Sequence, residues 1–263
     1  MSKETTSHGN PFESRQRGLS GSVIVAQGQS GTGKTRLLTE SWIRAGMLFG
    51  GACFALAPVQ DVEANVTSYR LGYQRALDKA RKDKAPRTAE HAIKCLDFLR
   101  TQVVVFRDPV ECLDAIEQYA EVTADGRPQF SLLFDESAVA RRESPILETL
   151  GPLARNLRGI VYLTGHRSMA LPPAMRAVRR ATVVWKSSDG TGDEELERAI
   201  ASIPGFKYSP VMGSVPKEER FYRGVKYTAN GPEFFEFNPH LTGFPDWMLL
   251  PALPTAIEPR TLT

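Results

Sequence analysis

One glycine-rich stretch constrains this chain more than any other feature. Residues 28–35 read GQSGTGKT and fit the pattern GxxxxGK[ST], with an apolar run before them at 22–27 and a helical pattern after them. Glycines at these spacings let backbone N–H groups converge on one anion, and the N-terminus of the following helix adds partial positive charge. The stretch therefore predicts a P-loop, which binds nucleotide phosphates between a strand and a helix.

The residue types within the loop predict its chemistry. Lys34 is expected to reach the β- and γ-phosphates, and Thr35 to ligate Mg²⁺ through its hydroxyl. ATP and Mg²⁺ are the expected cofactors. The predicted nucleotide-binding residues are Gly28, Gln29, Ser30, Gly31, Thr32, Gly33, Lys34 and Thr35.

An apolar strand that ends in two acids provides the second motif. The run FSLLF at 130–134 precedes Asp135 and Glu136, which is a Walker B pattern. Asp135 is expected to orient Mg²⁺ through water, and Glu136 to polarise the attacking water, which favours hydrolysis over transfer to an acceptor. The alternative is that Glu136 caps a helix beginning near Ser137.

The distribution of apolar runs predicts an α/β fold. Short β-branched runs alternate with helical patterns of three-to-four spacing, as in a mostly parallel sheet that is buried on both faces. The expected strands lie at 22–27, 52–57, 102–106, 130–134, 159–164 and 181–186. Two further strand-like runs around Asn230-Gly231 predict an antiparallel hairpin within 221–237.

The chain divides into three parts by composition. Residues 1–20 are polar and are expected to form a flexible arm, residues 21–240 the ATPase domain, and residues 241–263 a proline-rich tail. Within the domain, 62–101 is a helical basic insertion. The longest apolar run, at 47–59, is too short to span a bilayer, which favours a cytoplasmic protein.

The order of the motifs resembles a known superfamily. After the P-loop and a long insertion come FDE, GIVYLTGHR at 159–167 and LPPAMRAVRRATVVWK at 171–186. Over about residues 20–240 this is similar to the FtsK/HerA superfamily of DNA-pumping ATPases. More narrowly, it resembles the genome-packaging ATPases of tailless, internal-membrane double-stranded DNA viruses (tectivirus-type). The resemblance implies a RecA-like P-loop NTPase of the additional-strand (ASCE) class, with helices flanking a mostly parallel sheet and the late hairpin appended.

The resemblance also implies a function and partners. Such a protein hydrolyses ATP to translocate double-stranded DNA without regard to sequence, here into a preformed viral capsid. Family members act as rings, usually homo-hexamers. A capsid vertex or a membrane protein is the implied further partner, and the host cytoplasm or a virion vertex the implied location.

Two catalytic roles follow only from the resemblance. The family's polar sensor after Walker B is usually Gln, and here the nearest residue is His166, with Thr164 as the alternative. An arginine from the neighbouring subunit stabilises the transition state in such rings, and Arg179 and Arg180 are candidates. These two arginines are equally compatible with a solvated helix face or a DNA contact. The expected catalytic residues are thus Lys34, Glu136, His166, Arg179 and Arg180.

Cations gather within the basic insertion. Residues 62–101 hold nine Lys or Arg against five Asp or Glu, although the whole chain carries only +3. The cluster near a predicted helix end consists of Lys79, Arg81, Lys82, Lys84 and Arg87. These side chains either contact DNA phosphates or remain in solvent at a helix C-terminus, which cations favour.

Three other functions compete with DNA translocation. A zonula-occludens-toxin-like phage assembly ATPase generally carries a transmembrane helix after the ATPase domain. A P-loop small-molecule kinase would release a phosphorylated acceptor rather than free phosphate. A nucleotide-gated scaffold would not need Glu136.

Overall fold

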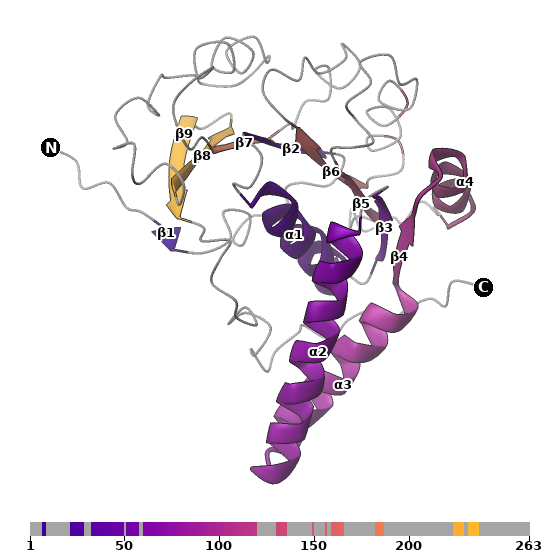
Figure 1. Cartoon of the computed structure of the whole chain (residues 1–263), viewed down its shortest axis with the longest axis vertical. Coiled ribbons are helices and arrows are strands. Elements are labelled where there is room, and N and C mark those ends of the chain that lie inside the picture. The colour runs from indigo at the N-terminus through magenta and orange to yellow at the C-terminus, as the bar shows by residue number, and fades with distance from the viewer. Residues whose placement is uncertain are drawn as a thin grey trace, which may run out of the picture.

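The described strands of the protein form a single sheet. The computed structural model describes residues 7–8, 22–28, 33–49, 51–57, 60–119, 130–135, 149, 156, 159–165, 182–186, 223–228 and 231–236. The strand order is β1-β9-β8-β7-β2-β6-β5-β3-β4 (Figure 1). The strands are β1 (Ser7–His8), β2 (Ser22–Gly28), β3 (Ala52–Leu56), β4 (Val103–Phe106), β5 (Phe130–Phe134), β6 (Ile160–Gly165), β7 (Thr182–Lys186), β8 (Arg223–Thr228) and β9 (Gly231–Glu236).

Four helices lie within the described ranges. They are α1 (Lys34–Phe49), α2 (Asp61–Lys82), α3 (Pro86–Thr101) and α4 (Pro109–Tyr119). α1 directly follows the P-loop, as its sequence predicts. α2 and α3 together fill the basic insertion between β3 and β4, so the helical character expected for 62–101 is confirmed.

The central strands confirm the predicted parallel sheet. The run β7-β2-β6-β5-β3-β4 is parallel throughout. β6 lies between the P-loop strand β2 and the strand β5 that precedes Asp135. One strand inserted between these two is the RecA-like, additional-strand arrangement expected from the sequence.

The strands are apolar on both faces because helices cover both sides. Ile24 of β2 belongs to the core cluster that α1, α2 and α3 complete, whereas its neighbour Val25 belongs to a second cluster completed by α4. Alternate residues of one strand thus enter two cores, as expected for a parallel sheet between helix layers. This explains why the strand runs show no polar alternation in the sequence.

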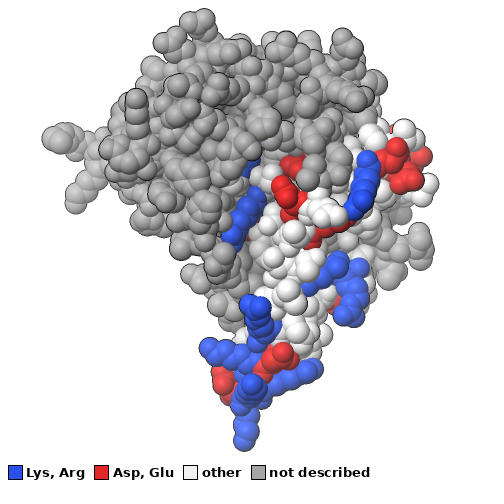
Figure 2. Space-filling model, viewed as in Figure 1, with Lys and Arg blue, Asp and Glu red and all other residues white. Residues whose placement is uncertain are grey.

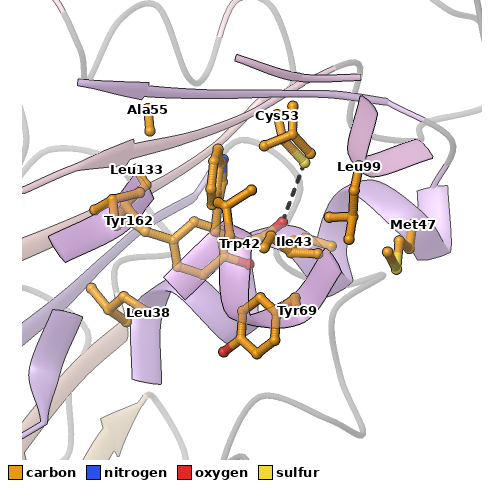
Figure 3. Packing of buried hydrophobic residues seen from close by; sticks show 14 of the residues in the cluster. Leu38, Trp42, Ile43, Met47, Cys53, Ala55, Tyr69, Leu99, Leu133 and Tyr162 are labelled. Atoms are coloured by element: carbon orange, nitrogen blue, oxygen red, sulfur yellow. Dashed lines mark hydrogen bonds between the residues drawn. The ribbon is translucent and has the colours of Figure 1, made fainter. Parts of the chain in front are cut away.

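Trp42 fixes α1 against the sheet. Its side chain is fully buried, and its indole Nε1 donates a hydrogen bond to the Ser131 carbonyl oxygen of β5 over 2.8 Å. The Cys53 thiol of β3 in turn donates to the Trp42 carbonyl oxygen at 3.6 Å (Figure 3). These contacts set the position of α1, and with it the P-loop residues at its start, relative to β5.

The predicted C-terminal hairpin is present. β8 and β9 pair antiparallel, and β8 also pairs antiparallel with β7, which appends the hairpin to the parallel strands. Gly231 has a φ of 108°, a left-handed conformation that favours glycine. Lys226 and Glu233 face each other across the hairpin and form an ion pair at 2.7 Å.

A short strand near the N-terminus is not predicted by the sequence. Ser7–His8 pairs parallel with β9, inside the stretch expected to be a flexible arm. The other residues of that stretch and the tail at 241–263 lie outside the described residues, so the three-part division remains a prediction. No helix in the described ranges is long and apolar enough to cross a membrane.

Candidate nucleotide-binding site

The P-loop ends at a glycine whose backbone conformation requires that residue type. Gly33 has a φ of 86°, in the left-handed region that side chains with a Cβ rarely adopt. Its carbonyl accepts a hydrogen bond from the Leu37 amide at 2.9 Å, which begins the helical ladder of α1. Lys34 and Thr35 therefore occupy the first turn of α1, where unpaired N–H groups and the helix dipole favour anions.

Three side chains from three elements meet beside this first turn. The Thr35 hydroxyl donates a hydrogen bond to Oδ1 of Asp135 over 3.1 Å. The Thr164 hydroxyl donates to the same Oδ1 over 2.9 Å. One carboxylate oxygen thus joins the start of α1 to the end of β6.

The sheet brings these residues together. β5 and β6 are adjacent and parallel, so the residues at their carboxyl ends share one edge of the sheet. The Asp135 amide donates to the Leu56 carbonyl at 2.9 Å, which continues the pairing of β5 with β3 one residue past the strand end. Ligands of open parallel sheets bind at this carboxyl edge.

Burial limits the access of water to the cluster. Asp135 is 5% exposed, Lys34 7% and Thr164 fully buried. An ionised carboxylate so far from solvent needs hydrogen-bond donors or a cation. The two threonine hydroxyls supply donors to Oδ1 and leave Oδ2 to other partners.

The donor set fits Mg²⁺. Carboxylate and hydroxyl oxygens are the ligands this cation prefers, usually with several waters and the nucleotide phosphates completing the octahedron. A hydroxyl has one proton and two lone pairs. Thr35 can therefore donate to Asp135 and present a lone pair to Mg²⁺ at the same time, while Lys34 lies one residue away to meet the phosphates.

The Thr35 backbone is held from the opposite side. The hydroxyl of Thr39, one turn later in α1, donates to the Thr35 carbonyl at 2.7 Å. Thr39 is fully buried, so this bond is shielded from water. The residue that would contact the metal thus has both its side chain and its carbonyl fixed.

The structure describes only part of the predicted site. It places Gly33, Lys34, Thr35 and Asp135 together, and Gly28 at the end of β2. The remaining predicted residues lie outside the described ranges: Gln29, Ser30, Gly31, Thr32, Glu136, His166, Arg179 and Arg180. Their assigned roles stay predictions.

Thr164 is the contact that the sequence ranked too low. It was the second choice for the sensor position after His166, yet its hydroxyl touches the Walker B carboxylate directly. The signal was a polar residue near the end of an apolar strand. The information needed to use that signal was the β5–β6 pairing, which the order of residues along the chain does not specify.

The loop geometry and the strand order define the protein as a P-loop nucleoside triphosphatase of RecA-like architecture. No family model and no curated protein matches the sequence. Among solved structures, one ATPase domain is similar to this chain. It is 12% identical, with a TM-score of 0.39 over 62% of this chain and 69% of the other.

Proposed function

We propose that this protein is an ATP-hydrolysing motor that translocates double-stranded DNA, and that its role is to package a viral genome into a preformed capsid. The observation that supports ATP hydrolysis is the shared acceptor Oδ1 of Asp135. It brings the P-loop threonine and a hydroxyl of the neighbouring strand to one buried carboxylate.

The proposed chemistry divides into binding and activation. Lys34 and the loop glycines bind the phosphates, and Thr35 with Asp135 holds Mg²⁺, which supplies charge neutralisation to the transferring phosphoryl group when bound. Glu136 follows Asp135 in the chain and accepts a proton from the attacking water. Thr164 orients Asp135, and His166 is the proposed phosphate sensor.

The proposed assembly is a homo-hexameric ring. In such a ring the nucleotide lies near a subunit boundary, where an arginine supplied by the neighbour stabilises the charge that develops on the phosphate. Arg179 and Arg180 are the proposed candidates. The arrangement predicts that hydrolysis depends on protein concentration.

DNA translocation and packaging are supported by the sequence resemblance alone. The motif order from the P-loop to Lys186 is that of DNA-pumping ATPases, and packaging ATPases are the subgroup with the same late hairpin. A capsid vertex or membrane protein is the proposed docking partner, with the host cytoplasm or the virion vertex as the location.

Phosphate release is the test of the hydrolysis step. The purified chain is assayed for free phosphate from ATP with and without long double-stranded DNA, beside the Glu136→Gln variant. We expect DNA to stimulate hydrolysis and the variant to abolish it. Transfer of phosphate to an added acceptor would favour a kinase, and function that survives in Glu136→Gln would favour a scaffold.

Translocation needs its own readout, because DNA can stimulate an ATPase that does not move. A linear duplex carrying a third strand at one site is incubated with the protein and ATP. We expect displacement of the third strand with ATP but not with a non-hydrolysable analogue. Stimulated hydrolysis without displacement would contradict the motor proposal.

A further inference from the structure

A helical hairpin projects from the sheet beside the nucleotide-binding edge. α2 and α3 leave and re-enter the sheet between the neighbouring parallel strands β3 and β4, and they pack side by side (Figure 1). A connection between adjacent parallel strands needs a single helix. The hairpin is therefore much longer than the fold requires.

The hairpin is a rigid extension of the core. The guanidinium of Arg70 on α2 donates to the Leu99 carbonyl of α3 at 2.7 Å, and the rings of Tyr73 and His91 meet edge to face at 6.4 Å between centroids. The Tyr73 hydroxyl also contacts the Met47 sulfur of α1 at 3.8 Å. The core cluster runs without a break from α1 to Leu77 and Ala92 in the hairpin.

The free end of the hairpin points away from the ATP site. α3 has 16 residues, a length of roughly 24 Å. Its C-terminal end lies at the amino edge of the sheet, because the Cys53 amide at the start of β3 donates to the Gln102 carbonyl at 2.7 Å. Asp135 lies at the opposite, carboxyl edge. Cations at the hairpin tip are thus too far away to bind the nucleotide phosphates of their own subunit.

The turn of the hairpin is a helix-capping motif with a cation at its key position. The Ala85 amide donates to the Ala80 carbonyl at 2.8 Å and the Lys84 amide to the Arg81 carbonyl at 3.3 Å, which is the Schellman pattern. Its left-handed residue is Lys84, with a φ of 52°. Glycine is the residue this position favours, so a lysine here places charge at the apex at a conformational cost.

The hairpin tip, residues 78–87, is strongly cationic. Figure 2 shows the blue side chains gathered at the end of the hairpin, with two acids among them. Its exposed cations are Lys79, Arg81, Lys82, Lys84 and Arg87, and its acids are Asp78 and Asp83. Within the part of the chain that the structure describes, none of these five cations forms an ion pair.

The absence of apolar anchors separates DNA from a membrane as the target. The exposed large hydrophobic side chains of the described residues are Leu71, Ile93 and Val110, and none lies in the tip. Surface-binding membrane elements combine cations with apolar residues that enter the lipid. A cluster of cations on a rigid support with no large apolar side chain is suited to the phosphate backbone of a nucleic acid.

We propose that the hairpin tip binds the phosphate backbone of duplex DNA, and that it is the element through which this subunit holds its DNA; this inference rests on the proposed function. Contacts to phosphates position a protein without reading sequence. Binding is therefore expected to be equal for unrelated duplexes and to weaken steeply with salt. Because the tip is packed through α2 against α1, it moves as one body with the helix that begins at the P-loop.

The test uses two full-length variants that lose the same charge. The tip variant carries Arg81→Gln, Lys82→Gln and Lys84→Gly. Glutamine matches arginine and lysine in helix propensity, and glycine relieves the left-handed position, so this variant should fold at least as well as the native chain. The control variant carries Lys94→Gln, Arg100→Gln and Arg107→Gln, which removes three exposed cations away from the tip.

Binding of two unrelated fluorescent duplexes is measured by anisotropy over a range of salt. We expect the tip variant to bind at least tenfold more weakly, with the slope of log affinity against log salt reduced by about one to three. The control should stay within about threefold of the native chain. Basal ATP hydrolysis without DNA should be equal in all three proteins.

The outcomes separate this inference from the function on which it rests. Equal DNA binding by the tip variant and the native chain would overturn the inference and leave a DNA motor that grips elsewhere. Tip-dependent binding to phosphatidylserine vesicles with no binding to duplex would overturn it in favour of a membrane surface. Loss of binding in the tip variant would support it even if no ATP hydrolysis were found, in which case only the motor proposal fails.

Discussion

Thr164 donates a hydrogen bond to Oδ1 of Asp135 over 2.9 Å, although the residues are 29 positions apart and belong to successive strands. The same oxygen accepts a bond from Thr35. The buried carboxylate is therefore oriented by one hydroxyl that also faces the metal position and by another that does not. Such outer partners commonly control the affinity and activity of a metal site.

Replacing Thr164 by valine should impair the site without a change of shape. Thr164→Val removes one donor from Asp135 and leaves the rotation of the carboxylate less restricted. We expect ATP hydrolysis to fall by about 10- to 100-fold, with a higher Mg²⁺ concentration needed for half-maximal activity. Steady-state hydrolysis across a Mg²⁺ titration measures both effects.

Thr39→Val is the matched control for that variant. Thr39 is equally buried and makes its bond to a backbone carbonyl rather than to Asp135. We expect its Mg²⁺ dependence to equal that of the native chain. If the two valine variants shift the Mg²⁺ dependence alike, the role of Thr164 is packing rather than orientation of the carboxylate.

The hydroxyl of Thr35 should be required, but not its methyl group. Thr35→Val removes both the donor to Asp135 and the proposed metal ligand, whereas Thr35→Ser keeps them. We expect at least about a 100-fold loss of hydrolysis in the valine variant and about native activity in the serine variant. Calorimetric binding of a non-hydrolysable ATP analogue, with and without Mg²⁺, shows whether the loss arises in the metal-bound complex. Equal Mg²⁺-dependent binding by the two variants would exclude Thr35 as a metal ligand.

Gly46 of α1 should resist a substitution that normally strengthens a helix. A Cβ at this position would lie 2.2 Å from the Cys53 sulfur and 2.8 Å from the Phe98 ring. Gly46→Ala is therefore expected to lower the free energy of unfolding by about 1–3 kcal/mol, despite the higher helix propensity of alanine. Denaturant unfolding followed by circular dichroism measures the change.

A second substitution tests the cause of that loss. Cys53→Ala removes the closer of the two clashing atoms. We expect the double variant Gly46→Ala, Cys53→Ala to be more stable than the sum of the single effects predicts, by about 0.5–3 kcal/mol. Strict additivity would show that the clash is relieved in some other way.

The three cysteines should be unreactive in the folded protein. Burial raises the pKa of the Cys53 and Cys112 thiols from 9.0 to about 12, and that of Cys95 to about 11. The thiolate is the reactive form. At pH 8 we expect no reaction of these thiols with a disulfide reagent until guanidinium unfolds the chain, when all three react. Fast labelling of the native protein would contradict their burial.

The same shifts give a pH dependence of stability. Below pH 9 these thiols are protonated in both the folded and the unfolded chain. Above pH 9 the unfolded chain loses those protons while the folded chain keeps them, so the free energy of unfolding falls as pH rises, by about 1.4 kcal/mol per thiol per pH unit up to about pH 11. Cys112→Ala should remove roughly one third of this thiol contribution, measured by denaturant unfolding at pH 8 and pH 10.

The sequence by itself determined the local chemistry of this protein. Glycine spacing sets the turn at Gly33, because only a residue without a Cβ adopts its left-handed backbone at low cost. Apolar runs buried on both faces identify the parallel strands, and helical spacing identifies α1 to α3. Each of these signals arises within a window shorter than one element, so it can be read without knowledge of the fold.

Only the tertiary structure decided which distant residues meet. The pairing of β6 with β5 brings Thr164 to Asp135, and the pairing of β1 with β9 draws Ser7 and His8 into the sheet. The projection of the hairpin likewise carries its cations away from the ATP site. These relationships depend on strand order and packing of whole elements, which many sequences with the same local patterns could satisfy differently.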